Sequence, residues 1–332
     1  LRGMFGFAVW NEKEQTLMLA RDFFGIKPVY YAEIDGHFVF ASEIKSILAF
    51  PGYERKVNQK ALEQYLSFQY APLEETFFKG IYKLMPGHML LYKNGNYEIK
   101  TYFKTKLTPD KWNRKTNMDQ LRSQLAEILK DSVKHHMLSD VEVGAFLSGG
   151  VDSGYLASAS GADQAFTVGF DEGDRYSEVN KAAKVAEKAS LKHHVKIISK
   201  QEFWDALPDV MYHMDEPLGD ASAVALYFLS KEAAGHVKVV LSGEGADELF
   251  GGYNIYREPE ALKKVAWIPF VLRRAVRKLA AKLPDVKGRD FLIRAGMKVE
   301  ERFIGNAYIY CEKEKAQILK NKVTGPSTQE YL

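Results

Sequence analysis

Residues 143–160 read VGAFLSGGVDSGYLASAS, and this stretch predicts the fold of the second half of the chain. The apolar run from Val143 to Leu147 has the length of a buried strand, and glycines and small hydroxyl residues follow it at once. Consecutive glycines let the backbone approach a ligand, and free N–H groups at the start of a helix attract anions. The pattern therefore predicts a strand, a phosphate-binding loop from Ser148 to Ser153, and a helix.

This loop differs from the two most common nucleotide-binding motifs. A Walker A loop requires GxxxxGK[ST], but no lysine follows these glycines, and a dinucleotide-binding turn requires GxGxxG. We therefore expect nucleotide chemistry other than γ-phosphoryl transfer. The competing interpretation is an ordinary strand-to-helix turn that is rich in small residues.

Strands and helices alternate on both sides of the loop. In chain order we expect a helix over 119–137, a strand over 141–147, a helix over 153–160, a strand over 165–170, a helix over 177–189, a strand over 193–198, a helix over 221–234 and a strand over 237–241. This alternation predicts an α/β fold with a doubly wound, mostly parallel sheet. Ligands of such sheets bind outside the carboxyl ends of the strands.

A second glycine-rich loop, SGEGADE at residues 242–248, follows the last of these strands. Both loops would face one crevice, and Asp152 and Asp247 would bring two carboxylates to a polyphosphate. That arrangement requires Mg²⁺ between them, because the like charges would otherwise repel each other. The competing interpretation is that each aspartate is a solvated surface residue.

The first hundred residues have a different pattern, with short β-rich runs separated by turns. We expect an antiparallel sheet with strands over 16–20, 25–31, 37–41 and 89–92, a hairpin at Asn94-Gly95, and a helix over 58–70. A charged stretch with little periodicity separates the two halves. We therefore predict one domain over residues 1–104, a linker over 105–118 and a second domain over 119–332.

The composition excludes several classes of protein. The 332 residues are 46% hydrophobic and 27% charged, as expected for a folded protein of about two domains. The net charge of +3 is too small for a nucleic-acid coat or a polybasic membrane binder, and Cys311, the single cysteine, excludes internal disulfides. No apolar run reaches the ~18 residues of a membrane span. We expect a cytoplasmic protein with no nucleic-acid or membrane partner.

Taken together, the motifs resemble those of the glutamine-hydrolysing asparagine synthetases. SGGVDS at 148–153 and SGEGADELFGGY at 242–253 are similar to that family's ATP-pyrophosphatase (PP-loop) domain. GMFGFA at 3–8, RDFFGIKP at 21–28 and FASEIK at 40–45 resemble the later strands of its glutaminase domain, an Ntn-type αββα fold of the class II glutamine amidotransferases. SGGVDS alone is shared with GMP synthetases, argininosuccinate synthetases and tRNA-modifying enzymes, so the specificity lies in the ordered set.

The resemblance implies roles for particular residues. Asp152 and Asp247 would bind Mg²⁺, and Glu244 would be the catalytic residue that handles the ammonia proton or positions the intermediate, with a pKa raised by burial. The segment from Asp215 to Asp220 would help to shape the acceptor pocket. The residues that would hold ATP are Leu147, Ser148, Gly149, Gly150, Val151, Asp152, Ser153, Val168, Ser242 and Gly243.

The implied reaction is the ATP-dependent conversion of aspartate to asparagine. The β-carboxylate of aspartate attacks the α-phosphate of ATP, pyrophosphate leaves, and ammonia converts β-aspartyl-AMP to asparagine and AMP. Ammonia would come from glutamine in the intact protein, and a homodimer is one expected assembly of it. The small-molecule partners are thus aspartate, ATP, and glutamine or ammonia.

Two features of the family pattern are absent. The family's glutaminase uses an N-terminal cysteine as nucleophile, but Leu1 stands at the start of this sequence and Cys311 is expected to be an ordinary thiol. The family's C-terminal substrate-pocket segment would lie beyond Leu332. We therefore expect a fragment of a longer polypeptide that does not itself hydrolyse glutamine.

Two further features are expected to be structural. The adjacent pairs His135-His136 and His193-His194 have a poor spacing for convergent metal ligands. The basic stretch 263–302 is expected to be a solvated helix that packs on the synthetase domain through the apolar side chains Leu272, Val276, Leu279 and Leu283. An RNA-binding or membrane-surface helix is the competing interpretation.

Three other functions remain open from the sequence. One is a related amide-forming PP-loop synthetase with a different acceptor acid, and another is a tRNA-modifying PP-loop enzyme that uses the basic helix. The third is an inactive nucleotide-binding regulator, although the presence of both Asp152 and Asp247 argues against it.

Overall fold

The computed structural model describes residues 1–106, 117–171, 178–302 and 309–320. They form two compact units, which are described separately. The first unit holds residues 1–58 and 71–243, and the second holds residues 59–70 and the chain from 244 onward. Most of the linker predicted over 105–118 lies outside the described residues, and the predicted domain boundaries stay predictions.

Two antiparallel sheets form the first half of the first unit, as the sequence predicts. One has the order β1-β2-β6-β7, with β1 at Gly6–Asn11, β2 at Thr16–Arg21, β6 at His88–Lys93 and β7 at Asn96–Thr101. The other has the order β4-β3-β5, with β4 at His37–Ala41, β3 at Tyr30–Ile34 and β5 at Ile81–Lys83. Asn94 and Gly95 join β6 to β7 with φ values of 52° and 77°, which confirms the predicted hairpin.

The strand predicted over 25–31 is wrong, because β3 begins only at Tyr30. The preceding residues wrap around the buried carboxylate of Asp22, which accepts hydrogen bonds from the backbone N–H groups of Phe24, Ile26 and Lys27. A carboxylate with several backbone donors fixes a loop rather than a ladder of strand pairs. The apolar residues between 25 and 31 therefore do not indicate the local structure of this segment.

Side chains between the two sheets form one core, and side chains beneath the second sheet form another. Leu19 and Leu90 of the first sheet meet Tyr31 of the second, whereas Ala32 on the opposite face of β3 packs with Ile44 of helix α1, Ile44–Leu48. Tyr31 and Ala32 pack on opposite faces of the sheet because successive side chains of a strand point to opposite faces. The antiparallel half is thus a layered sandwich with a short helix on its outer sheet.

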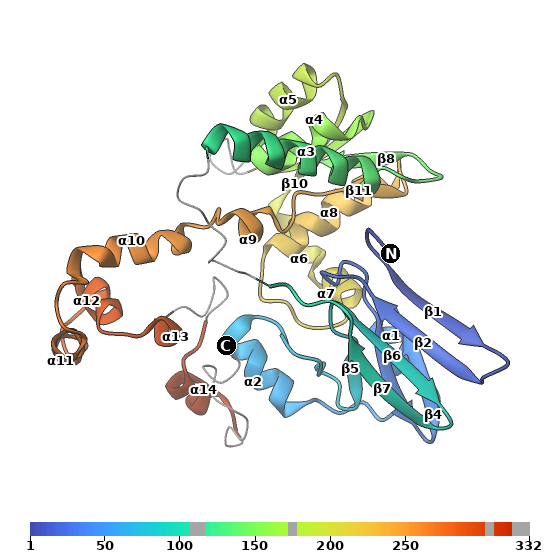
Figure 1. Ribbon diagram of the computed structural model, residues 1–332, viewed down its shortest axis with the longest axis horizontal. Coiled ribbons are helices and arrows are strands. Elements are labelled where there is room, and N and C mark those ends of the chain that lie inside the picture. The colour runs from blue at the N-terminus through green and yellow to red at the C-terminus, as the bar shows by residue number, and fades with distance from the viewer. Residues whose placement is uncertain (107–116, 172–177, 303–308, 321–332) are drawn as a thin grey trace. The chain divides into compact units, whose positions relative to one another are not determined.

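The second half of the first unit contains the predicted parallel sheet. Its order is β10-β9-β8-β11, with β8 at Val143–Phe146, β9 at Gln164–Phe170, β10 at Lys192–Ile198 and β11 at Val239–Leu241 (Figure 1). All three strand pairings are parallel. The predicted doubly wound α/β class is confirmed.

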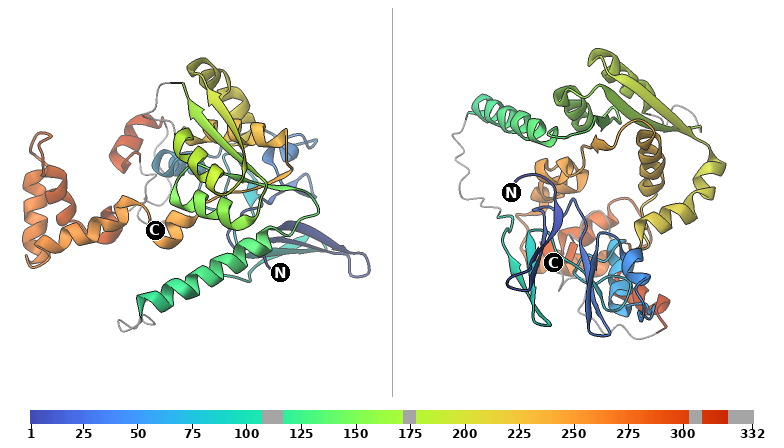
Figure 2. Two further views of the ribbon diagram at one scale, coloured as in Figure 1. Left: turned by 90° about the horizontal axis from the view of Figure 1, so that it is seen from above. Right: turned by 90° about the vertical axis from the view of Figure 1, so that its right-hand side faces the viewer.

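Helices cover both faces of this sheet (Figure 2). Helices α4, Val151–Ser160, and α5, Val179–Lys188, pack on one face through small residues such as Ala157 and Ala182. Helix α8, Ser222–Ala234, packs on the other face. Two short helices before it, α6 at Lys200–Asp205 and α7 at Leu207–Met214, were missed because Pro208 divides a stretch too short to show a clear period.

Helix α3, Met118–His136, occupies the position predicted for the helix over 119–137, and few of its side chains are buried. Only Val133 is buried in this helix, whereas Leu125 is 40% and Ile128 is 65% exposed. Apolar residues at helical spacing thus predicted the helix correctly, but such spacing does not specify which segment covers the apolar face.

The second unit is helical, as predicted for the basic C-terminal part. Its elements are α2 at Gln59–Phe68, α9 at Ala246–Phe250, η2 at Asn254–Arg257, α10 at Glu258–Leu262, η3 at Lys263–Val265, α11 at Phe270–Ala280, α12 at Arg289–Ala295, α13 at Val299–Arg302 and α14 at Glu312–Ile318. Within this unit α11 packs against α12. Leu272, Val276, Leu279 and Leu283 are exposed, and the expected packing of this helix on the synthetase domain stays a prediction. None of the helices in the described ranges is long and apolar enough to cross a membrane.

Candidate active site

Strand β8 leads directly into the glycine-rich loop. The buried residue Leu147 continues the ladder, since its N–H donates to the carbonyl of Phe166 at 2.9 Å. Gly149 then has φ of +76°, and a Cβ there would lie 2.7 Å from Cβ of Lys181 and 2.8 Å from the backbone nitrogen of Ala182. The loop turns so tightly against α5 that only glycine fits at this position.

Two serines close the loop upon itself. The hydroxyl oxygens of Ser148 and Ser153 lie 2.8 Å apart, and the Ser148 N–H donates to Oγ of Ser153 at 3.1 Å. Helix α4 starts with Gly150 as its N-cap, and no side chain caps it. Its first N–H groups therefore have no intrahelical acceptor, as at any uncapped helix start, and α4 begins at Val151 rather than at residue 153. That these N–H groups bind phosphate stays a prediction.

A buried polar pair supports the start of the loop. The hydroxyl of Thr167 donates to the carbonyl of Leu147 at 2.6 Å and therefore accepts from Nε2 of His193 at 2.7 Å. Burial lowers the pKa of His193, which favours the neutral ring, and the contact with Thr167 then requires that its proton be on Nε2. Neither residue could be recognised as a positioning residue from the sequence, because Thr167 lies on β9 and His193 on β10, far from the motif.

The second loop reaches the first one at Gly243. A Cβ on Gly243 would lie 3.2 Å from the Ser153 nitrogen and 3.4 Å from Cβ of Asp152. The structure thus brings Ser242-Gly243, which follows β11, to the start of α4, as predicted. Val168 is half-buried on the opposite face of β9 from Ala165, against the cluster that includes Val224, and its contact with adenine stays a prediction.

The side chain of Asp152 is available for a cation. It is exposed in the first turn of α4 and accepts no hydrogen bond from the described residues. Carboxylate oxygens are the hard donors that Mg²⁺ prefers. The donor chemistry and the adjacent predicted anion site therefore fit a phosphate-bound Mg²⁺.

The rest of the second loop belongs to the second unit and is ordered by its glycines. Gly245 has φ of +89° and caps α9, and a Cβ on Gly252 would lie only 1.8 Å from Oδ1 of Asp247. Tyr253 donates to Oε1 of Glu248 at 2.8 Å, and chiefly this hydrogen bond raises the pKa of Tyr253 to about 12. The loop thus holds Asp247 in the first turn of a short helix.

Glu244 differs from the expectation drawn above. Its side chain is exposed, so the burial that was expected to raise its pKa is not present. The residue stands at the open start of a loop that follows Gly243, which explains the exposure. Contact of Glu244 or Asp247 with the Ser148–Ser153 loop stays a prediction, because both belong to the second unit.

The acidic segment that begins at Asp215 connects the two halves of the first unit. The Asp215 carboxylate accepts from the N–H groups of Ile44 at 2.7 Å and Lys45 at 3.2 Å, and it forms an ion pair with Nζ of Lys45 at 2.9 Å. Glu216 accepts from the N–H of Phe77 at 2.6 Å, and burial raises the pKa of Glu216. We call these contacts the acidic clamp. The acceptor-pocket role of residues 215–220 stays a prediction.

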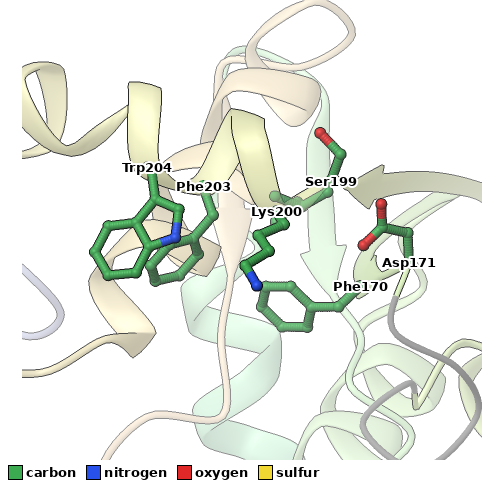
Figure 3. A pocket seen from close by; sticks show the side chains of 7 residues that line it. Phe170, Asp171, Ser199, Lys200, Phe203 and Trp204 are labelled. Carbon is green, nitrogen blue, oxygen red and sulfur yellow. The ribbon is translucent and has the colours of Figure 1, made fainter.

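A cavity of about 400 Å³ opens at the carboxyl ends of β9 and β10 (Figure 3). Phe203 and Trp204 of α6 face Phe170 and Asp171 at the end of β9 across it. It contains none of the residues that the sequence assigned to ATP. Its position at the carboxyl edge nevertheless puts it on the ligand side of the sheet.

The sheet, its loop and α4 define a doubly wound α/β domain that is joined to an antiparallel sandwich. Residues 124–309 match the family described as asparagine synthase, and residues 1–103 match the glutamine amidotransferase domain. The chain belongs to the asparagine synthase family, which confirms the resemblance found from the sequence.

Individual relatives show the range of the family. Asparagine synthetase [glutamine-hydrolyzing] 1 of Bacillus subtilis is 42% identical over 97% of this chain and 51% of its own length. Asparagine synthetase [glutamine-hydrolyzing] 3 of the same organism is 29% identical over 81% of this chain and 46% of its own. Amidase chyE of Penicillium rubens is 30% identical over 85% of this chain and 45% of its own length. The chain spans about half the length of the curated relatives it matches.

Proposed function

We propose that this chain is part of an enzyme that converts aspartate to asparagine with ATP. The β-carboxylate of aspartate attacks the α-phosphate, pyrophosphate leaves, and ammonia from glutamine hydrolysis displaces AMP from β-aspartyl-AMP. The observation that carries the proposal is the Ser148–Ser153 loop at the carboxyl end of β8, in a chain of the asparagine synthase family. Such a loop binds phosphate through backbone N–H groups rather than through a lysine.

The nucleotide is bound mainly by backbone. The N–H groups at the start of α4 neutralise charge that develops on the α-phosphate and on the leaving pyrophosphate, while Ser148 and Ser153 supply hydroxyls. Ser242 and Gly243 close over the nucleotide, since Gly243 already contacts the start of α4. Val168 is assigned to the adenine side. The pair Thr167 and His193 keeps the loop in position from below.

Mg²⁺ would be held by Asp152 and Asp247. When bound, the ion neutralises the polyphosphate and makes pyrophosphate a better leaving group. The carboxylate of Asp152 is exposed beside the anion site, which supports this assignment.

Glu244 is proposed to contact the intermediate or the incoming ammonia. Because its side chain is exposed in the folded chain, bound substrates would have to exclude water from it before it could act on the intermediate. The acid–base role is therefore expected to develop only in the substrate complex. We place the reaction in the cytoplasm, with small-molecule partners only.

The native polypeptide that contains this chain provides the test. With ATP, Mg²⁺ and ammonia, pyrophosphate release should require aspartate and should not occur with glutamate or with other acids. Aspartate labelled with ¹⁸O in its β-carboxylate should transfer one labelled oxygen to AMP, because the acyl–oxygen bond breaks when ammonia attacks. Unlabelled AMP, or release supported equally by another acid, would overturn the proposed acceptor.

A further inference from the structure

Side chains from two segments that are distant in sequence converge at the amino-terminal edge of the parallel sheet. They are His194 on β10, Glu232 in the last turn of α8 and His236 just beyond it. One nitrogen of each ring and one carboxylate oxygen lie within 4.8 Å of one another. This is the one cluster of histidine, cysteine and acidic side chains with metal-ligand spacing in the part of the chain that the structure describes.

The ring of His194 is held in place from two sides. It stacks on the fully buried ring of Phe166, with centroids 5.0 Å apart and planes 18° apart. Its Nε2 lies 2.9 Å from Oε1 of Gln164, whose amide group donates to the carboxylate of Glu142 at 2.6 Å. Because a carboxylate only accepts, the amide oxygen of Gln164 must face the ring. Such an outer contact orients metal-binding histidines.

Glu232 and His236 are brought together by the end of α8. They are four residues apart, and the N–H of His236 donates to the carbonyl of Ala233 at 2.9 Å, which continues the helical path past Gly235. Nε2 of His236 lies 3.7 Å from Oε1 of Glu232, and the rings of His236 and His194 have centroids 4.0 Å apart. Two rings and one carboxylate therefore share a single small volume.

We propose that His194, Glu232 and His236 form a binding site for a divalent transition metal of the Zn²⁺ type. Two imidazoles and a carboxylate suit Zn²⁺, Co²⁺ or Ni²⁺ and do not suit Mg²⁺, which prefers oxygen ligands. Ligand atoms around a tetrahedral Zn²⁺ are ~3.4 Å apart, given bonds of ~2.1 Å. Glu232 and His236 are already near that separation, and rotation of the exposed His236 side chain brings the set together.

The location separates this site from the ATP chemistry. His194 is near the start of β10, and His236 stands before β11, whereas the nucleotide loops follow the carboxyl ends of β8 and β11. In a parallel sheet these are opposite edges. The bound metal would tie β10 to the end of α8, and would so fix the segment that leads through β11 to Ser242-Gly243. Its role is thus structural or regulatory.

Metal titration of the untagged, metal-free 332-residue chain tests the site. Calorimetry with Zn²⁺ should give one ion per chain, and Co²⁺ should give the visible ligand-field absorption of a low-coordinate site. Glu232→Gln and His236→Ala should each weaken binding at least ~10-fold. His135→Ala is the matched control, because His135 also faces an acid four residues away, Asp131 at 3.4 Å, without a second histidine.

The controls separate a real site from adventitious surface binding. If His135→Ala weakens Zn²⁺ binding as much as His236→Ala does, or if neither Glu232→Gln nor His236→Ala changes it, the site is overturned. X-ray absorption of the Zn²⁺-bound wild-type chain adds a readout that needs no variant. It should show two imidazole ligands, and fewer than two would overturn the proposal.

Discussion

His193 and His194 are neighbours in the sequence but serve different regions of the molecule. The side chain of His193 lies on the face of the sheet that α4 and α5 cover, where it supports the nucleotide loop through Thr167. The side chain of His194 lies on the face that α8 covers and meets His236. Alternation along a strand is the reason. Two adjacent histidines therefore indicate no function until it is known which face of the strand each side chain occupies.

The same contrast separates the two edges of the parallel sheet. At the carboxyl edge, the loop is encoded by six consecutive residues whose conformation follows from their own backbone preferences. At the amino edge, the three clustered side chains come from residues up to 42 positions apart, His194 to His236. We expect the Ser148–Ser153 loop to be sensitive to changes in its own backbone. We expect the His194, Glu232 and His236 cluster to be sensitive to a change in any of its three side chains.

The largest expected effect is that of Gly149→Ala. The substitution forces a side chain into a left-handed conformation and against α5, so the free energy of unfolding should fall by about 2–5 kcal/mol. Gly154→Ala is the control, because its Cβ would lie 3.7 Å from Val185, an ordinary contact, and should stabilise α4 slightly. Urea unfolding of both variants measures whether each substitution lowers or raises the free energy of unfolding. Equal effects would mean that the loop does not depend on its backbone geometry.

Asp152→Asn should leave folding intact and reduce pyrophosphate release by ~100-fold or more, since it removes charge at the phosphate site. The side chain is exposed, so its loss should not change the melting temperature. Asp163→Asn, in an exposed turn before β9, should leave the rate unchanged. A comparable loss of rate in both variants would argue against a role specific to Asp152. Steady-state assays of the native polypeptide make the comparison.

Thr167→Val should lower the free energy of unfolding by about 1–3 kcal/mol. The change keeps the shape of the side chain but leaves the Leu147 carbonyl and the His193 ring without their hydroxyl partner. Thr167→Ser keeps the hydroxyl and should recover most of the loss. Thr167→Val should also bind ATP more weakly than wild type does, whereas Thr167→Ser should not. A serine variant as unstable as the valine one would assign the effect to packing.

The smallest expected effect concerns the acidic clamp and depends on pH. Burial raises the pKa of Glu216 in the folded chain, so folding favours its protonated form, and stability from this group is lost as pH rises above the ordinary carboxyl range. The stability of Glu216→Gln relative to wild type should therefore increase between about pH 4 and pH 7. The exposed Glu187→Gln should show no such trend. Parallel profiles would show that Glu216 is not desolvated.

The sequence predicted much of the site where the signal was contiguous. The loop from Ser148 to Ser153, the strand before it and the helix after it were found because glycines, small hydroxyls and apolar runs act over a few residues. The meeting of Gly243 with that loop followed from a general rule about parallel strands. The burial expected for Glu244 is not found, because burial depends on which residues of other segments pack against a side chain.

By itself, the sequence determined the family, the α/β class with its antiparallel partner, and the position of the glycine-rich loop between β8 and α4. The tertiary structure alone decided that Thr167 and His193 support the loop, that Asp215 and Glu216 clamp the two halves of the first unit, and that His194 meets Glu232 and His236. The physical reason is the distance along the chain over which each interaction acts. Backbone conformation and helical or strand period are set by near neighbours in the chain, whereas side-chain contacts between strands and helices depend on register and on which face each residue occupies.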